Sequence, residues 1–250
     1  MARNPKLEHV KAKVRTRGDV RKVGISYMSR LYPIVHHMHE VLRLHESDDA
    51  SIRTSIHQYV IALAGHLETF FRDIFRFTLE QDASFFDRIV QVHRIRLPAE
   101  HDLEQEGVTR YDFVTEALTL QSAGSVAGAL DPFFLPDGFR AAVENTRLVY
   151  AVPSRSALAQ GFPLSAFPNW WKDFTQLFEL RHELVHDANT TSCVERSHIA
   201  RLESLAVILP QYVTLMVLTK GHPEAINKAD AFPAILLVED FLAIDWEVVP

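Results

Sequence analysis

Cysteine is almost absent from this 250-residue chain, which has only Cys193. A single cysteine excludes a disulfide within the chain and any zinc site built on several cysteines. Glycine is also scarce: nine residues are about half the usual frequency. Because the turns of all-β folds use glycine freely, this shortage favours an all-α fold.

A long apolar segment is missing as well. Residues 1–13 carry charges with no apolar stretch behind them, so no signal peptide is expected. The most apolar window, Leu205–Leu218, spans 14 residues, which is short of the roughly 18 to 20 needed to cross a bilayer. With 47% hydrophobic and 23% charged residues, the chain is expected to be a folded cytoplasmic protein that does not bind membranes.

The net charge of −6 is unevenly distributed along the chain. Residues 1–24 hold eight basic and two acidic residues, a net charge of +6, so the remainder carries −12. A basic arm on an acidic body is compatible with binding to a phosphate backbone. A solvated N-terminal helix explains the same pattern equally well.

Two stretches in the first third of the chain have helical periodicity. Over residues 24–45 apolar residues recur every three or four positions, and Pro33 is expected to kink this helix or split it in two. Ser47-Asp48-Asp49 is typical of an N-cap followed by acids in the first turn. A long amphipathic helix is predicted from there to about Glu80.

Residues 82–167 are less regular, and we interpret them as an insertion between core helices. An acidic loop is expected at Glu100–Glu106, and the small residues of Ser122–Gly128 are placed between helices rather than within one. Short helices are predicted near three segments: Phe85–His93, Tyr111–Leu120 and Gly138–Leu148.

The last third is predicted to contain two helices and a tail. The first helix starts with Pro168 in its first turn and ends near residue 189. Ser192 and Glu195 form a capping-box pattern that opens the second, which runs to about residue 220 and contains Pro210. The resulting organisation is a basic helical segment at 1–46, a helical domain at 47–220, and a tail at 221–250 that packs on it and favours a short strand pair.

One candidate function comes from His182-Glu183-x-x-His186, the zincin pattern. On a helix, positions four apart share a face, so both imidazoles can bind one Zn²⁺ while the glutamate activates its water. The metzincin continuation fails, because Asn189 stands where glycine is needed and Ser192 where the third histidine should be. Other candidates for a third ligand lie further along the chain: Glu195 and Glu203.

A second candidate function comes from Arg181 and His186, which overlap the first pattern. Arg181 lies on the apolar stripe of its helix, and a guanidinium keeps its charge, so it needs a partner there. Either Glu68 or Asp73 pairs with it, or Arg181 faces a cleft or subunit interface and binds phosphate. His186 lies about 140° further round an ideal helix, so the two side chains converge only if the helix unwinds at its end.

Two segments make the chain resemble the HEPN superfamily, especially its predicted ribonucleases. Leu63–Phe75 is similar to the long HEPN helix with its Leu-Glu-x-Phe core and a following acid. Leu180–Asp187 is similar to the HEPN Arg-polar-x3-His motif at a helix end, followed by a loop and a capped helix. Together with their surroundings the two segments cover about residues 47–80 and 168–220.

The resemblance implies a helical bundle that forms a homodimer and cleaves RNA without a metal or other cofactor. Arg181 would then bind phosphate and stabilise the transition state, and His186 would act as acid or base. Supporting roles fall to His182, to Glu68 as the helix acid that orients Arg181, and to Asp73. A toxin or antiviral defence effector is implied, with RNA as substrate and an antitoxin or another defence protein as a further partner.

Three functional hypotheses remain open from the sequence. The leading one is the HEPN endoribonuclease; the others are a zinc peptidase and a non-catalytic HEPN module that binds RNA or a protein. Two further clusters are weaker candidates for a functional site. The group His36, His37, His39 and Glu40 can hold a metal or contact phosphates, and Trp170-Trp171 can stack on bases or pack in the core.

Overall fold

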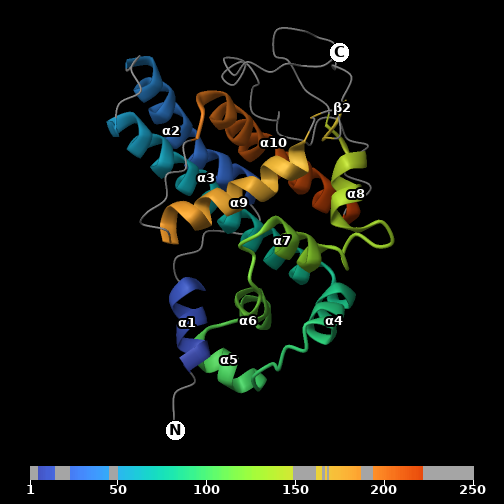
Figure 1. The fold of residues 1–250 in the computed structure, drawn as a ribbon. Coiled ribbons are helices and arrows are strands. Elements are labelled where there is room, and N and C mark those ends of the chain that lie inside the picture. Colours follow the sequence, from blue (N-terminus) through green and yellow to red (C-terminus); the bar gives the residue numbers. More distant parts are fainter. Residues whose placement is uncertain are drawn as a thin grey trace.

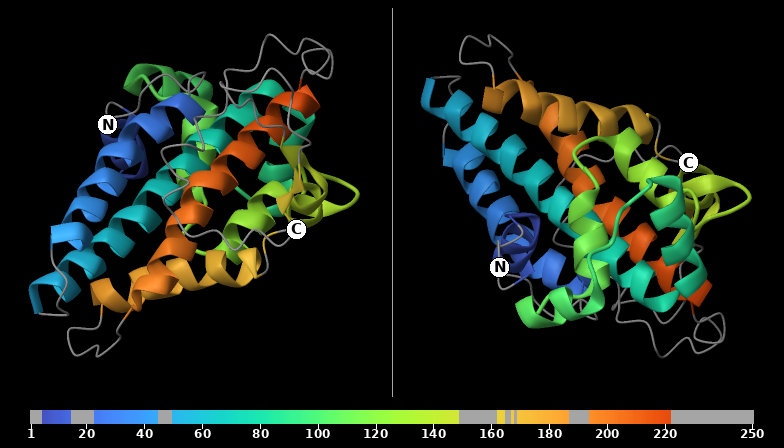
Figure 2. Two further views of the ribbon diagram at one scale, coloured as in Figure 1. Left: turned by 90° about the horizontal axis from the view of Figure 1, so that it is seen from above. Right: turned by 90° about the horizontal axis from the view of Figure 1, so that it is seen from below.

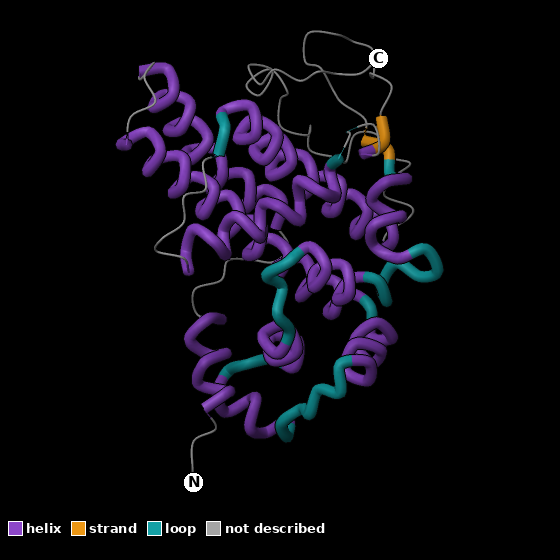
Figure 3. The backbone as a smooth tube through the Cα atoms, viewed as in Figure 1, coloured by secondary structure: helices purple, strands orange, loops and turns teal. Residues whose placement is uncertain are grey.

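The protein is all-α in the computed structural model, as the glycine shortage predicted. The structure describes these residues: 5–14, 23–44, 50–148, 162–164, 167, 169–186 and 194–221. The helices are α1 (Pro5–Val14), α2 (Val23–Leu44), α3 (Ala50–Gln81), α4 (Ala83–Val92), α5 (Glu100–Glu106), α6 (Arg110–Ala117), α7 (Ala123–Leu130), α8 (Gly138–Asn145), α9 (Trp170–His186) and α10 (Arg196–Gly221). Two-residue strands, β1 (Arg147–Leu148) and β2 (Phe162–Pro163), pair antiparallel (Figure 3).

Helix α3 is the central element, because α2, α9 and α10 all pack against it (Figures 1 and 2). Its 32 residues bury an apolar face from Ile52 to Leu79. Phe70 and Phe71 are fully buried there, and Phe71 contacts Phe174 of α9 with ring centroids 5.4 Å apart. The four long helices thus form one bundle whose core is rich in aromatic rings.

A smaller group of helices lies beside this bundle. Leu7 and Val10 of α1 pack with Leu103, Val108 and Phe113, from α5, α6 and the turn between them, in a core cluster separate from the main one. Figure 1 shows α1, α5 and α6 together on one side of the bundle. By contrast, buried residues of α4, α7 and α8 belong to the main core.

Two segments expected outside helices are in fact helical. The acidic stretch Glu100–Glu106 is α5, because its acids lie in the first turn, where they suit the helix dipole, and Gly107 ends it at φ 65°. Most of the small-residue stretch belongs to α7, which Ser122 opens with a capping box to Ser125. Ala123, Val126, Ala129 and Leu130 form the buried face of this short helix.

Pro33 lies inside α2, which is one continuous helix and not two. Pro33 is exposed there, so its ring meets solvent and not the core. Several expectations fall outside the described residues: the N-cap at Ser47-Asp48-Asp49, Pro168, the cap at Ser192, and the strand pair in the tail 221–250.

Helix α10 corrects the expectation about apolar length. Among the described residues, one stretch, Ser197–Leu218, is long and apolar enough to cross a membrane by length and composition alone. It exceeds the expected 14-residue window because helix continues through the polar positions that interrupt the apolar run. Since 72% of that stretch is buried inside the protein, most of its apolar side chains already have partners within the chain.

Candidate functional site

The candidate site lies on α9, which is anchored by its apolar face. Trp170, Phe174, Leu177 and Phe178 are buried against the bundle. At the other end of the helix, His182, Val185 and His186 are exposed, while Arg181 is half-buried at the edge of the packed face. The helix therefore presents its motif residues at the border between core and solvent.

Arg181 pairs with Glu68 of α3, which confirms one of the two partners considered from the sequence. The guanidinium Nη2 lies 3.4 Å from Glu68 Oε2, with 26% of the Arg181 side chain and 12% of the Glu68 side chain exposed. Asp73, the other partner considered, lies 3.8 Å from Arg30 of α2 instead. Arg181 is therefore held in place by a carboxylate but still reaches solvent.

A chain of ion pairs continues from Glu68 across the molecule, and we call it the charge ladder. Arg72 donates to Glu68 Oε1 at 3.0 Å and also to Glu116 of α6 at 3.0 Å. Lys13 of α1 donates to the same Glu116 oxygen at 2.8 Å. The ladder thus runs from Arg181 through α3 and α6 to α1.

His182 and His186 share one exposed face of α9. Their ring centroids are 4.7 Å apart with the ring planes tilted by 47°, as expected for residues one turn apart. Val185 lies between them in the sequence and is 49% exposed. An exposed apolar side chain flanked by two imidazoles gives this helix end a mixed apolar and titratable surface.

Arg181 and His186 do not meet within one chain. Helix α9 stays helical to His186, so the unwinding that would bring the two side chains together does not occur before that residue. No hydrogen bond joins them in the part of the chain that the structure describes. Both groups reach solvent, however, so each can act on a ligand or meet a second subunit.

The zincin pattern has its two imidazoles on one face but lacks a third ligand within the described ranges. No group of three or more His, Cys, Asp or Glu residues there is arranged to hold a metal ion. Of the two glutamates considered, Glu203 is buried and bonded to His39 and Tyr59, and Glu195 is exposed. The described residues therefore do not complete a zinc site around His182 and His186.

A buried polar network joins α2, α3 and α10, and sequence reasoning missed it. Glu203 is 2% exposed; it pairs with Nε2 of His39 at 2.8 Å and accepts a hydrogen bond from the hydroxyl of Tyr59. The bond to Glu203 raises the pKa of His39, while burial and the nearby Glu203 carboxylate raise the pKa of Tyr59. One signal was available: Glu203 is a lone acid among apolar residues of its helix.

Several of the remaining sequence candidates have structural partners. In the histidine cluster, His39 binds Glu203, Glu40 pairs with Arg43 at 2.7 Å, and no metal-ligand group forms among the described residues. Trp170 is buried and donates from Nε1 to Glu144 at 3.1 Å. Trp171 is partly buried, under the Arg140 guanidinium at 5.2 Å. Packing accounts for both tryptophans.

The start of α9 is tied to α10 by a second ion pair. Asp173, buried in the first turn of α9, accepts hydrogen bonds from Arg201 Nε at 3.2 Å and from Arg201 Nη2. His198 lies nearby, where burial, followed by Arg201, lowers its pKa. The crossing of α9 and α10 is thus fixed by charge as well as by apolar packing.

Comparison of the chain with protein families, with curated proteins and with solved structures gave no match. What bears on function is therefore the geometry of α9, α3 and α10 and the motif residues that these helices carry.

Proposed function

We propose that this chain is a metal-independent endoribonuclease of the HEPN type that works as a homodimer. The observation that carries the proposal is the position of Arg181: a half-exposed guanidinium tied to Glu68 at 3.4 Å, on the same helix end as the exposed His186. A guanidinium held by one carboxylate keeps other N–H donors for a phosphate. An exposed histidine on the same helix end is a side chain that can accept or donate a proton.

The chemistry uses the substrate's own 2′-hydroxyl. One imidazole removes its proton while the oxygen attacks the adjacent phosphorus, and the bond from phosphorus to the 5′-oxygen breaks. A protonated imidazole gives its proton to the leaving 5′-oxygen, so the products are a 2′,3′-cyclic phosphate and a 5′-hydroxyl. Arg181 stabilises the charge of the phosphorane, and each proton transfer contributes about 10²–10⁴-fold.

Arg181 and His186 do not meet within one chain, but a dimer would bring the Arg181 of one subunit close to the His186 of the other. A two-fold axis beside the end of α9 would place the motif of each subunit opposite the motif of the other. One composite site would then hold two arginines and two histidines. The exposed Val185 between His182 and His186 offers an apolar contact on this axis. We assign the acid and base roles to the two His186 residues, with His182 in support.

The biological setting follows from the HEPN resemblance alone. Such a nuclease would be a toxin or an antiviral defence effector in the cytoplasm, held in check by an antitoxin or another defence protein. RNA would be its substrate, and no cofactor would be needed.

The central experiment is an RNA cleavage assay on the purified chain with and without EDTA. We expect cleavage that EDTA does not affect, with 2′,3′-cyclic phosphate ends, and a loss of about 10²-fold or more in Arg181→Ala and in His186→Ala. Matched controls are Arg53→Ala and His37→Ala, which alter exposed residues on α3 and α2 and should leave the rate unchanged.

Other outcomes would contradict the proposal. Proteolysis that EDTA abolishes would favour the zinc peptidase, and Glu183→Gln would abolish that activity while leaving an HEPN nuclease largely active. A stable dimer without any cleavage would favour the non-catalytic module.

The dimer is tested separately. Val185→Glu places a charge at the proposed contact, so it should shift the molar mass measured by light scattering from dimer to monomer and reduce cleavage in parallel. Ile25→Glu is the control, since Ile25 is 61% exposed on α2. Full activity in a monomeric Val185→Glu variant would contradict a composite site.

A further inference from the structure

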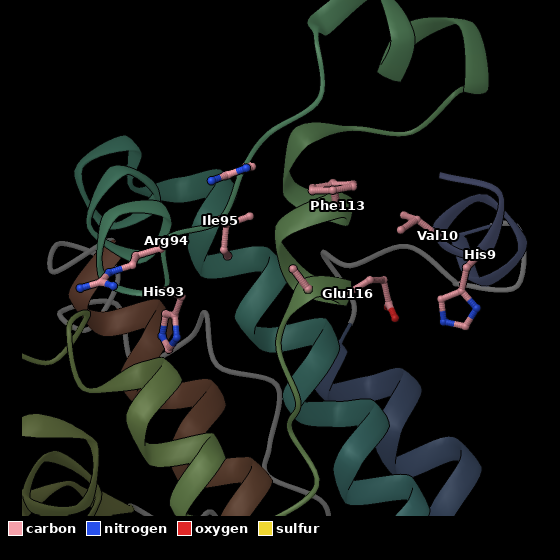
Figure 4. A pocket seen from close by; sticks show the side chains of 9 residues that line it. His9, Val10, His93, Arg94, Ile95, Phe113 and Glu116 are labelled. Atoms are coloured by element: carbon pink, nitrogen blue, oxygen red, sulfur yellow. The ribbon is translucent and has the colours of Figure 1, made fainter. Parts of the chain in front are cut away.

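A pocket of about 660 Å³ lies away from α9, among α1, α6 and the segment that follows α4. Figure 4 shows His93, Arg94 and Ile95 on one side, His9 and Val10 on the other, and Phe113 and Glu116 of α6 between them. None of the lining residues belongs to α9. Its volume lies within the range of small-molecule sites in proteins.

The rim of this pocket carries two arginines and two histidines that are exposed to solvent. Arg94, Arg96, His9 and His93 are exposed, and none of them makes a side-chain hydrogen bond or ion pair with another described residue. Most other arginines in the described ranges pair with a carboxylate, as Arg72 and Arg181 of the charge ladder do. Two guanidiniums at one pocket, without an ion-pair partner among the described residues, are therefore available for an anion.

Glu116 does not cancel this positive charge. Its carboxylate is 1% exposed and is held by Arg72 at 3.0 Å and Lys13 at 2.8 Å. Two cations thus offset the one acid in the wall. Ile95 is a half-buried apolar side chain beside the charged rim, and Val10 and Phe113, which are mostly buried, also line the pocket.

Arg94 has a backbone conformation that favours glycine. Its φ is 50°, and it follows the end of α4, where its N–H bonds to the Gln91 carbonyl at 3.2 Å and the next N–H bonds to that of Val90 at 3.0 Å. Glycine is the usual residue at such a helix end. An arginine held there despite the strain points to a role for its side chain.

We propose that this pocket binds a nucleoside phosphate, with the phosphate on Arg94 and Arg96 and the base or sugar against Val10, Ile95 and Phe113. The two histidines add hydrogen-bond donors to the phosphate. The phosphate can belong to a free nucleotide or to the end of an RNA strand, and both present the same chemistry. This site is independent of the ribonuclease proposal, because no residue is shared.

Isothermal titration calorimetry tests the site directly. The probes are adenosine 5′-monophosphate, adenosine as the version without phosphate, and a short 5′-phosphorylated single-stranded RNA added to the His186→Ala chain. We expect the monophosphate or the RNA to bind, adenosine to bind at least about tenfold more weakly, and the affinity to fall with rising salt.

Two substitutions locate the binding without endangering the fold. Arg94→Gly relieves the helix-end strain, so it should raise the melting temperature; combined with the exposed Arg96→Ala, it should weaken binding by about tenfold or more. Arg53→Ala, an exposed arginine on α3 without an ion-pair partner among the described residues, should change affinity less than about twofold. If only the RNA binds, and with the same arginine dependence, the phosphate comes from a strand.

Absence of binding by every probe would overturn the proposal, as would binding that the double variant leaves unchanged. Neither result bears on cleavage, because the measurement does not depend on it.

Discussion

Buried carboxylates fix the relative positions of the helices. Glu203, Glu116 and Asp173 have at most 6% of their side chains exposed, and each accepts hydrogen bonds from other helices. An acid left without such partners in the interior costs several kcal/mol. Each of these side chains therefore selects one arrangement of the helices around it.

The pairing of His39 with Glu203 makes stability depend on pH. Its hydrogen bond raises the pKa of His39 above the ordinary 6.5, so the folded chain holds this proton more tightly than the unfolded chain. The contribution is complete below pH 6.5 and is lost as the pH rises through the folded pKa. Between about pH 6 and pH 8, the free energy of unfolding measured with urea should fall more in the natural chain than in His39→Gln.

The exposed neighbour His37 provides the control for this prediction. His37→Gln should keep the natural pH profile. If His39→Gln also keeps the natural pH profile, the pairing of His39 with Glu203 does not contribute to the pH dependence of stability in solution.

The charge of Arg181 left three partners open in the sequence, which were Glu68, Asp73 and a bound phosphate, and only the family resemblance favoured Glu68. The need for a partner follows from the charge of a guanidinium on an apolar stripe. The choice depends on how α3 is rotated against α9, because residues five apart lie about 140° apart around a helix. The network around Glu203 was missed for the same reason: its partners come from helices far apart in the chain.

At the scale of elements, helix length decided what the sequence could predict. The long helices α3, α9 and α10 bury enough apolar positions for their period to be visible. Helix α5 buries only Leu103, and α7 is built mainly of alanine and glycine. Neither sequence therefore shows the repeat of apolar residues that indicates a helix. Helix α5 has no side-chain cap at its start; for α7 the available signal was the capping box of Ser122 and Ser125, which lies in a stretch predicted to be between helices.

The cap of α7 leads to a stability prediction. Ser122 Oγ accepts a hydrogen bond from the Ser125 N–H at 3.0 Å, and Ser125 Oγ accepts one from the Ser122 N–H at 3.0 Å. Ser122→Ala should lower the free energy of unfolding by about 1 kcal/mol, measured by urea titration. Ser122→Thr keeps the hydroxyl and should lose less; equal losses would show that the cap is not the cause.

Pro33 leads to a prediction of the opposite sign. Proline lacks the N–H that a helix interior uses, and it is about 3 kcal/mol less favourable there than alanine. Because Pro33 is exposed, Pro33→Ala removes no core contact. We expect the free energy of unfolding to rise by about 1–3 kcal/mol; a decrease would mean that the packing of α2 on α3 requires the proline.

At the scale of the whole molecule, two apolar clusters of unequal size hold the chain together. The main one includes residues from α2 to α10, whereas the smaller one joins α1 to α5 and α6. The smaller cluster buries less apolar surface, so it should open first. The pocket lies where the smaller cluster meets the end of α4.

Hydrogen exchange tests this difference. Val10 is 4% exposed in the smaller cluster, and Val10→Asp would bury an unpaired carboxylate there. We expect exchange in α1 and α5 to rise by about tenfold or more while α3 and α10 stay protected. Val92→Asp, at a position 62% exposed, is the control; loss of protection in α3 with Val10→Asp would show that both clusters unfold as one unit.

The charge ladder from Arg181 to Lys13 has a consequence for the protein's ancestry. Each of its two acids bridges two cations, so replacing Glu68 or Glu116 alone leaves like charges facing each other. During evolution, such a residue is expected to be replaced only together with a compensating substitution at a neighbouring residue of the charge ladder. Among orthologous chains, the five positions should therefore covary, although they come from α1, α3, α6 and α9.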